Sequence, residues 1–177
     1  MPDGGFQIGR TIALVGLMGS GKSIVGRRLA KRLGHPFVDS DTEIERNAGM
    51  SITEIFERHG EDAFRRNERG TIFRLLETPP RVIATGGGAF ADEATRRRLL
   101  DECLTIWLDA PIPILIARLA GDERRPLLRG EDPDRRLEDL FAERRPYYAL
   151  ADLHVECADL PPERIVDRIV PTLECHG

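Results

Sequence analysis

The sequence predicts an α/β fold of three layers, in which a five-stranded parallel sheet lies between helices. The chain has 177 residues, which is close to the size of one domain. Short apolar runs alternate along it with longer amphipathic segments, a pattern typical of a parallel sheet that is covered on both faces. Hydrophobic residues make up 41% of the sequence and charged residues 32%, which is ordinary for a globular protein and too apolar for a disordered one.

Five short apolar runs are the predicted strands. Each is too short for a typical helix, and each ends at a turn-forming or charged residue. The predicted strands are Thr11–Val15, Pro36–Asp39, Arg81–Ala84, Leu104–Leu108 and Leu153–Glu156. Because no repeat, low-complexity tract or linker separates them, residues 1–177 are predicted to form a single domain.

The amphipathic segments between these runs are the predicted helices. Apolar residues recur at helical spacing from Ile24 to Leu33, and Gly34 follows as a typical stop signal. Ser51 and Glu54 have the Ser-x-x-Glu form of a capping box. The predicted helices are Ser23–Leu33, Asp41–Ala48, Ser51–His59, Glu61–Leu76, Asp92–Leu100, one that Pro111 opens, Asp134–Leu150 and Pro162–Leu173.

Charge and cysteine usage argue against several classes of protein. The net charge is −4 with a pI of about 5.6, whereas nucleic-acid-binding domains are usually basic. No run of 18 apolar residues occurs, and residues 1–10 lack the pattern of a secretory signal. Cys103, Cys157 and Cys175 are far apart and form no CxxC pair, which is typical of reduced thiols in the cytoplasm. We therefore expect a cytoplasmic protein with no nucleic-acid or membrane partner.

Residues Gly16–Ser23 match the full G-x-x-x-x-G-K-[ST] pattern of a phosphate-binding loop, or P-loop. The glycines let several backbone N–H groups converge on a phosphate, and the following helix adds its positive N-terminal end. Lys22 is a compact charge for the β- and γ-phosphates, and the Ser23 hydroxyl is a ligand for Mg²⁺. A chance match in a Gly-rich turn is the alternative, but the motif lies between a predicted strand and a predicted helix, as a P-loop must. The predicted ATP-binding residues of this segment are Gly19, Ser20, Gly21, Lys22, Ser23 and Ile24.

The distribution of lysine narrows the class further. Only 2 of the 26 basic residues are lysines, Lys22 and Lys31. Lys22 stands where a compact ammonium is needed rather than a planar guanidinium, and Lys31 is expected to be a solvated charge. Guanine-specific switch proteins usually carry Asn-Lys-x-Asp after the P-loop. No lysine follows Lys31, so this motif is absent and a GTPase is disfavoured.

Two aspartates follow predicted strands and are candidates for orienting Mg²⁺. Asp109 follows the more apolar strand, although it also fits as a residue at the start of the next helix. Asp39 is followed by Asp41, and two carboxylates beside a phosphate site suggest divided roles. One would serve the metal, and the other would bind or deprotonate an acceptor hydroxyl. Alternatively, Asp41 merely caps the next helix.

Several motifs together resemble shikimate kinases, a family of small-molecule P-loop kinases. The resemblance runs from Ile12 to Leu153, with the motifs in the family's order and near its spacing. The motifs are Gly16–Ser23, Asp39–Ser40–Asp41, Phe64–Arg65–Arg66, Gly86–Gly87–Gly88, Arg125–Pro126–Leu127–Leu128 and Arg144. The resemblance implies a three-layer P-loop kinase fold with a mobile lid over about residues 121–132 and a helical substrate-binding region over about 41–77.

The resemblance also implies an activity and a role for each site residue. The activity is transfer of the ATP γ-phosphoryl group to the 3-hydroxyl of shikimate, with Mg²⁺ as cofactor, in aromatic amino acid biosynthesis, and we expect a monomer. Lys22, Asp41 and Arg125 match the catalytic positions, and Asp41 matches the family's base. Ser23 and Asp39 match the metal side. The residues that match substrate positions are Asp41, Arg65, Gly86, Gly87, Gly88 and Arg144, and those that match further ATP positions are Arg118 and Arg125.

Simpler interpretations exist for some of these residues. Arg65 lies four residues after Glu61, the spacing of a surface ion pair. The three glycines also fit a simple turn, and Phe56 and Phe64 fit core packing. Residues 157–162 lack the basic residues that the family often has beside adenine. A related kinase acting on gluconate or a nucleotide is the alternative function, and a non-catalytic ATP-binding module is a third.

Overall fold

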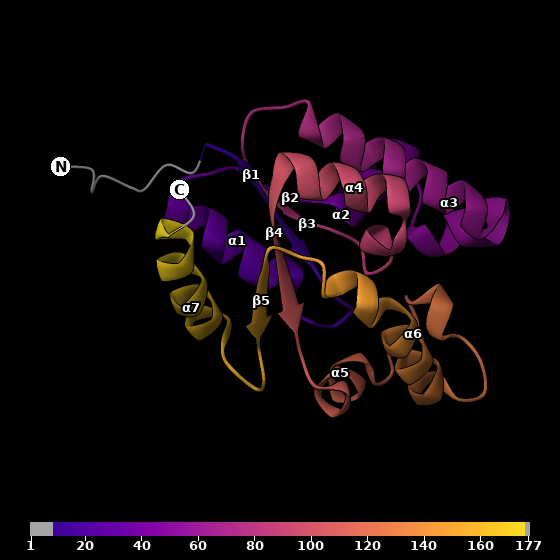
Figure 1. Cartoon of the computed structure of the whole chain (residues 1–177). Helices are drawn as coiled ribbons and strands as arrows, with labels where there is room; N and C mark the ends of the chain where they lie inside the picture. Colours follow the sequence, from indigo (N-terminus) through magenta and orange to yellow (C-terminus); the bar gives the residue numbers. More distant parts are fainter. Residues whose placement is uncertain (1–8, 176–177) are drawn as a thin grey trace.

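Five parallel strands form one sheet in the order β2-β3-β1-β4-β5 (Figure 1). The computed structural model describes residues 9–175, so most of the segment on which the expectation of no secretory signal rests lies outside it. The strands are β1 (Thr11–Val15), β2 (Phe37–Asp39), β3 (Val82–Ala84), β4 (Cys103–Asp109) and β5 (Leu153–Glu156). All five predicted strands are present, and the predicted parallel sheet is confirmed.

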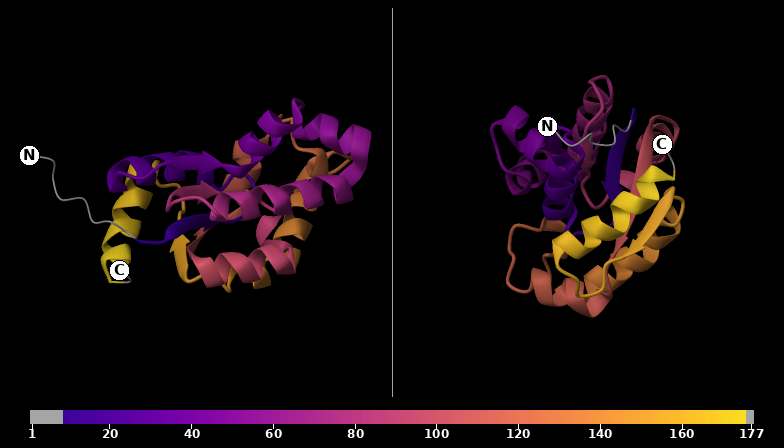
Figure 2. Two further views of the ribbon diagram at one scale, coloured as in Figure 1. Left: turned by 90° about the horizontal axis from the view of Figure 1, so that it is seen from above. Right: turned by 90° about the vertical axis from the view of Figure 1, so that its left-hand side faces the viewer.

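Helices cover both faces of the sheet and complete the three layers (Figures 1 and 2). Helices α1 and α7 pack against each other beside β1–β3 and β5, whereas α4 packs against β4 and beside α3. The seven α-helices of the described residues are α1 (Lys22–Leu33), α2 (Ser40–Ala48), α3 (Ile52–Leu76), α4 (Glu93–Glu102), α5 (Ile112–Leu119), α6 (Pro133–Tyr148) and α7 (Pro162–Glu174). None of these helices is long and apolar enough to cross a membrane.

The core lies around the central strand. All residues of β1 are buried, which explains why this strand reads as an unbroken apolar run. A second, smaller cluster of Ile44, Ile55 and Phe64 lies between α2 and α3. The region predicted to bind the substrate therefore has a small apolar core of its own.

Helix α3 differs from the prediction at its middle. The capping box at its start is confirmed, because the Ser51 N–H donates to Glu54 Oε2 at 2.8 Å and the Glu54 N–H donates to Ser51 Oγ at 3.2 Å. The two predicted helices form one element that is broken only at Gly60, where φ is 81° and ψ is 172°. Glycine tolerates this left-handed conformation, so the element changes direction there without a connecting loop.

Residues 121–132, predicted as a mobile loop, carry a short piece of helical structure. They contain one 3₁₀ turn, Pro126–Leu128, whose last residue is buried. Two contacts lead from this segment to α3: Arg129 Nη1 donates to Glu57 Oε1 at 2.8 Å, and Thr53 Oγ1 donates to Arg124 O at 3.5 Å. Turn chemistry of this kind is hard to see in a segment dominated by charge and glycine.

Candidate active site

A cavity of about 850 Å³ opens where β1, β2 and β3 end, at the edge of the sheet where α/β proteins usually bind ligands. The residues predicted for the site come from both halves of the chain, and the fold brings all of them to the wall of this cavity. They are Gly19, Ser20, Gly21, Lys22, Ser23, Ile24, Asp39, Asp41, Arg65, Gly86, Gly87, Gly88, Arg118, Arg125 and Arg144. Their individual roles remain predictions.

The P-loop has the backbone that anion binding requires. Gly16 has a φ of +142°, and a Cβ there would lie 2.6 Å from the Leu108 carbonyl oxygen, so only glycine fits. Gly21, at the start of α1, also has a positive φ of +90°. No side chain among the described residues caps α1, and its first turn holds no acidic residue. The N–H groups and the positive end of the helix therefore face the cavity.

Lys22 is buried inside this loop. Its Nζ donates to Gly16 O at 2.7 Å and to Leu17 O at 3.0 Å. Burial lowers the pKa of Lys22 to about 8, and the nearby Arg125 adds to the effect. A bound polyphosphate would favour the charged ammonium and oppose this burial cost.

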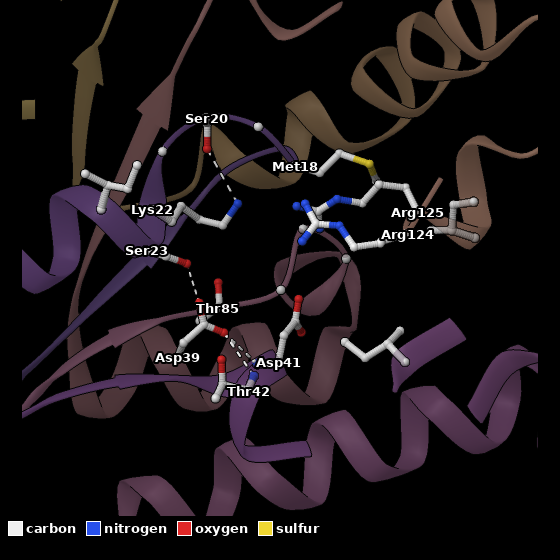
Figure 3. A pocket seen from close by; sticks show the side chains of 18 of the residues that line it. Met18, Ser20, Lys22, Ser23, Asp39, Asp41, Thr42, Thr85, Arg124 and Arg125 are labelled. Atoms are coloured by element: carbon white, nitrogen blue, oxygen red, sulfur yellow. Dashed lines mark hydrogen bonds between the residues drawn. The ribbon is translucent and has the colours of Figure 1, made fainter. Parts of the chain in front are cut away.

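Asp39 connects the P-loop helix to the next helix. The Ser23 hydroxyl donates to Asp39 Oδ2, while Oδ1 accepts from the N–H groups of Asp41 and Thr42 and so caps α2 (Figure 3). Asp109, the other candidate for the metal, lies instead against His154, whose Nε2 is 2.9 Å from its Oδ2, and it does not line the cavity. Of the two candidates, Asp39 is the one that lines the cavity, and the cap of α2 is Asp39 rather than Asp41.

The carboxyl groups of the partly buried Asp41 and the buried Glu68 lie beside Gly86. A Cβ on Gly86 would lie 2.8 Å from Asp41 Oδ1 and 2.5 Å from Glu68 Oε1. Neither oxygen has a hydrogen-bond partner within residues 9–175. Burial, with the neighbouring charge of Glu68, raises the pKa of Asp41 to about 7, and burial also raises the pKa of Glu68. A carboxyl group with a pKa near neutrality is suited to accepting a proton.

Two arginines lie around this pair. Arg65 makes the predicted contact with Glu61 at 3.4 Å, but it also pairs with the buried Glu68 at 2.8 Å. The guanidinium of Arg65 packs on Gly88, where a Cβ would lie 2.4 Å from Nη1. Arg144 is 4% exposed, and its Nη1 has no hydrogen-bond partner in the described part of the chain. Both guanidinium groups are thus available to an anionic ligand.

Sequence reasoning missed Glu68 as a residue of this region and missed the contact that Tyr148 makes. Glu68 lies three residues after Arg65, but so Arg-rich a chain offers many such pairs. The Tyr148 hydroxyl donates to the carbonyl oxygen of Gly87, 61 positions away in the sequence. No sequence signal marks this contact, which fixes the glycine segment against α6.

The opposite end of the cavity is largely apolar. Leu160, Pro162 and Ile165 line this end. The N–H of Leu160 donates a hydrogen bond to the carbonyl oxygen of Cys157 at 3.1 Å and so closes a turn. Arg118 donates to the Gly19 carbonyl oxygen at 3.0 Å. The sequence has no basic residues at positions 157–162, and in the structure apolar side chains of this region line the cavity instead.

The five-stranded parallel sheet covered by helices and the phosphate-binding loop after β1 are those of a P-loop kinase. A family model described as "Shikimate kinase" matches residues 18–174, and the chain belongs to this family.

Individual relatives agree with the family match. A protein of Bradyrhizobium diazoefficiens named "Shikimate kinase" is 50% identical over 167 residues, which cover 94% of this chain and 81% of that protein. The structure of "Shikimate kinase from Acinetobacter baumannii in complex with shikimate" aligns with a TM-score of 0.94 at 36% identity and covers 97% of both chains. A gluconokinase structure from Sinorhizobium meliloti aligns with a TM-score of 0.59 at 18% identity, covering 97% of this chain and 99% of that chain, and shares the fold alone.

The burial of Asp41 predicts that the variant Asp41→Asn is more stable than the parent at about pH 8. Above a pKa of about 7 the parent buries a charge, and a neutral amide avoids about 1–3 kcal/mol of this penalty. In the unfolded chain the Asp41 carboxyl group has a pKa of 3.8. The stability of the parent relative to Asp41→Asn therefore falls as pH rises from 3.8 toward 7, and this stability difference is constant above pH 7. Thermal unfolding at about pH 5 and about pH 8 measures it.

The exposed Asp101 of α4 provides the control variant, Asp101→Asn, which should change neither curve. Equal stability of Asp41→Asn and the parent at both pH values would contradict a buried, costly carboxylate.

Proposed function

We propose that this chain transfers the γ-phosphoryl group of ATP to the 3-hydroxyl of shikimate, giving shikimate 3-phosphate and ADP. The observation that carries the proposal is the position of Asp41. Its carboxyl group, of which Oδ1 is buried, lies in one cavity with the P-loop and with Arg65 and Arg144. Membership in the shikimate kinase family supports the same assignment.

The acceptor end suits a small ring with a carboxylate and several hydroxyls. Arg65 and Arg144 would hold the carboxylate, because guanidinium groups bind carboxylates in a bidentate and directional way. The missing side chain of Gly86 leaves Asp41 Oδ1 open to a ring hydroxyl. Binding at the carboxylate would therefore set which hydroxyl meets Asp41.

The transfer step uses Asp41 on one side and cations on the other. Asp41 accepts the proton of the 3-hydroxyl, whose oxygen forms the bond to the γ-phosphorus while the bond from that phosphorus to the β-phosphate oxygen breaks and ADP leaves. Lys22, Arg125 and the N–H groups at the start of α1 offset the charge on the transferring group. In this chemistry catalysis consists mainly of positioning and charge compensation.

The residues near the phosphates fit Mg²⁺. Ser23 and Asp39 present oxygen ligands, which this cation prefers. No cluster of three or more His, Cys, Asp or Glu side chains within residues 9–175 could hold a metal ion alone, which agrees with a cation that takes its remaining ligands from phosphates and water. The bound cation would neutralise phosphate charge.

The chain is proposed to work as a monomer in the cytoplasm. Every predicted site residue lines the cavity of one chain, so no second copy is needed to complete it. Two of its three free cysteines, Cys103 and Cys157, are buried, as is common for reduced thiols.

A panel of acceptors tests the function. Purified protein with Mg²⁺ and ATP should release ADP with shikimate, and mass spectrometry should show one added phosphate. Gluconate and nucleoside monophosphates should give background rates. Asp41→Asn should bind ATP like the parent and lose most of its turnover, by at least about 100-fold. A faster rate with gluconate or a nucleotide would replace shikimate as the acceptor, and ATP binding without transfer to any acceptor would support a non-catalytic module.

The pair of carboxyl groups predicts a pH dependence. Asp41 must be ionised to accept a proton, so kcat/KM for shikimate should fall as pH decreases through the Asp41 pKa of about 7. Glu68→Gln removes a neighbouring negative charge and should move this acid limb to lower pH, besides weakening shikimate binding through Arg65. An acid limb at the same pH in both proteins would show that Glu68 does not act on Asp41. Glu61→Gln, the exposed partner of Arg65, should leave the limb in place.

Residues 121–132 are proposed to close over the phosphates. Arg125 belongs to this segment and lines the cavity, and closure would exclude water from the transferring group. Hydrogen exchange in this segment should slow when ATP and shikimate bind together. Exchange that ligands leave unchanged would rule out closure.

A further inference from the structure

Two adjacent arginines of the segment 121–132 share one carboxylate. Arg124 donates to Asp122 through Nε at 2.8 Å and through Nη2 at 3.2 Å, and its backbone N–H donates to the same side chain at 3.1 Å. Arg125 lies beside this carboxylate, with its Nε 3.6 Å from Asp122 Oδ2. The three residues therefore form one ionic cluster.

The two arginines of this cluster are the members that face the cavity. Arg124 and Arg125 line the cavity, whereas Asp122 does not. The Asp122 side chain is 15% exposed and the Arg124 side chain 88%. In the view of Figure 3, the side chains of Arg124 and Arg125 extend from the segment 121–132 toward the part of the cavity that holds Lys22. A carboxylate behind the arginines thus holds one edge of the Arg124 guanidinium and leaves its other N–H groups toward the cavity.

The positive charges on this side of the cavity outnumber the negative charge of Asp122. Lys22, Arg124 and Arg125 all line this cavity, and the charge of Arg125 acts on Lys22 and lowers its pKa, because like charges repel. Asp122 offsets one of the two arginine charges. A polyphosphate between the arginines and Lys22 would offset the others, because guanidinium groups form strong, directional hydrogen bonds with phosphate oxygens.

We infer that Arg124 is a second phosphate-binding arginine and that Asp122 is the positioning residue for both arginines. The inference rests on the proposed function, since its ligand is the polyphosphate of ATP. Asp122 limits the rotamers of two long side chains before ATP arrives, which lowers the entropy lost on binding. A solvated ion pair on the surface, the alternative for an arginine this exposed, would make no contribution to ATP binding.

The test compares Arg124→Ala, Asp122→Asn and the double variant with the parent. Arg124→Ala should raise the KM for ATP about tenfold, the effect of losing a hydrogen bond to a charged group, and should leave the KM for shikimate nearly unchanged. Asp122→Asn should raise the KM for ATP less. In the double variant the KM for ATP should rise by less than the product of the two single increases, because both substitutions remove the same interaction between Asp122 and Arg124.

A matched control removes an arginine from a similar pair outside the cavity. Arg135 and Asp139 lie 3.6 Å apart on the exposed face of α6, and Arg135→Ala should leave both KM values unchanged. Arg124→Lys keeps the charge but not the planar group, so it should restore only part of the ATP affinity.

Three results would overturn parts of the inference. Equal ATP KM values for Arg124→Ala and Arg135→Ala would make Arg124 a surface charge. A lower ATP KM in Asp122→Asn would show that the carboxylate competes with phosphate instead of positioning the arginines. Fully independent effects in the double variant would separate the two residues. Calorimetric titration with ATP alone gives the same comparison without turnover, so a failure of the proposed shikimate activity would be recognised separately.

Discussion

The site depends on the three hydrogen bonds that Asp39 accepts at the end of β2. One carboxylate oxygen accepts from Ser23 in the first turn of α1, and the other caps α2 through the N–H groups of Asp41 and Thr42. The phosphate-binding helix and the helix that carries Asp41 are therefore set relative to each other by one side chain. Because reacting groups must approach closely and in line, such a shared anchor matters more for transfer than the strength of either hydrogen bond.

Around Asp39 lie charged side chains with buried atoms that have no hydrogen-bond partner in the described part of the chain. Atoms of Asp41, Glu68, Arg125 and Arg144 are buried without a hydrogen-bond partner within residues 9–175. Such groups cost stability. The carboxylate, hydroxyls and phosphates of the proposed substrates would supply the missing partners, so part of the binding free energy would relieve a cost that folding has already incurred. Burial of apolar side chains in the large core around β1 offsets this cost.

Much of the fold and of the candidate site could be predicted from the sequence, because both depend on local patterns. β1 is an unbroken apolar run, and the P-loop has fixed spacing. What could not be predicted depends on contacts between distant residues. The apolar strand before Asp109 made this residue one of two candidates for orienting Mg²⁺, and only the fold shows that it lies against His154. Tyr148 reaches Gly87 only through the packing of α6. These residues carry no signal in their own neighbourhood.

The use of lysine and arginine follows from the shape of each site. Lys22 is held between two carbonyl oxygens of a tight loop, where three directional N–H groups on a small ammonium fit and a planar guanidinium would not. Arg65 and Arg144 lie at the other end, where a planar group can grip a carboxylate at two points. Arg65 also forms an ion pair with Glu68, as Arg124 does with Asp122. In both places a carboxylate that pairs with an arginine limits the motion of its side chain, so a flexible side chain can act as a more rigid binding group.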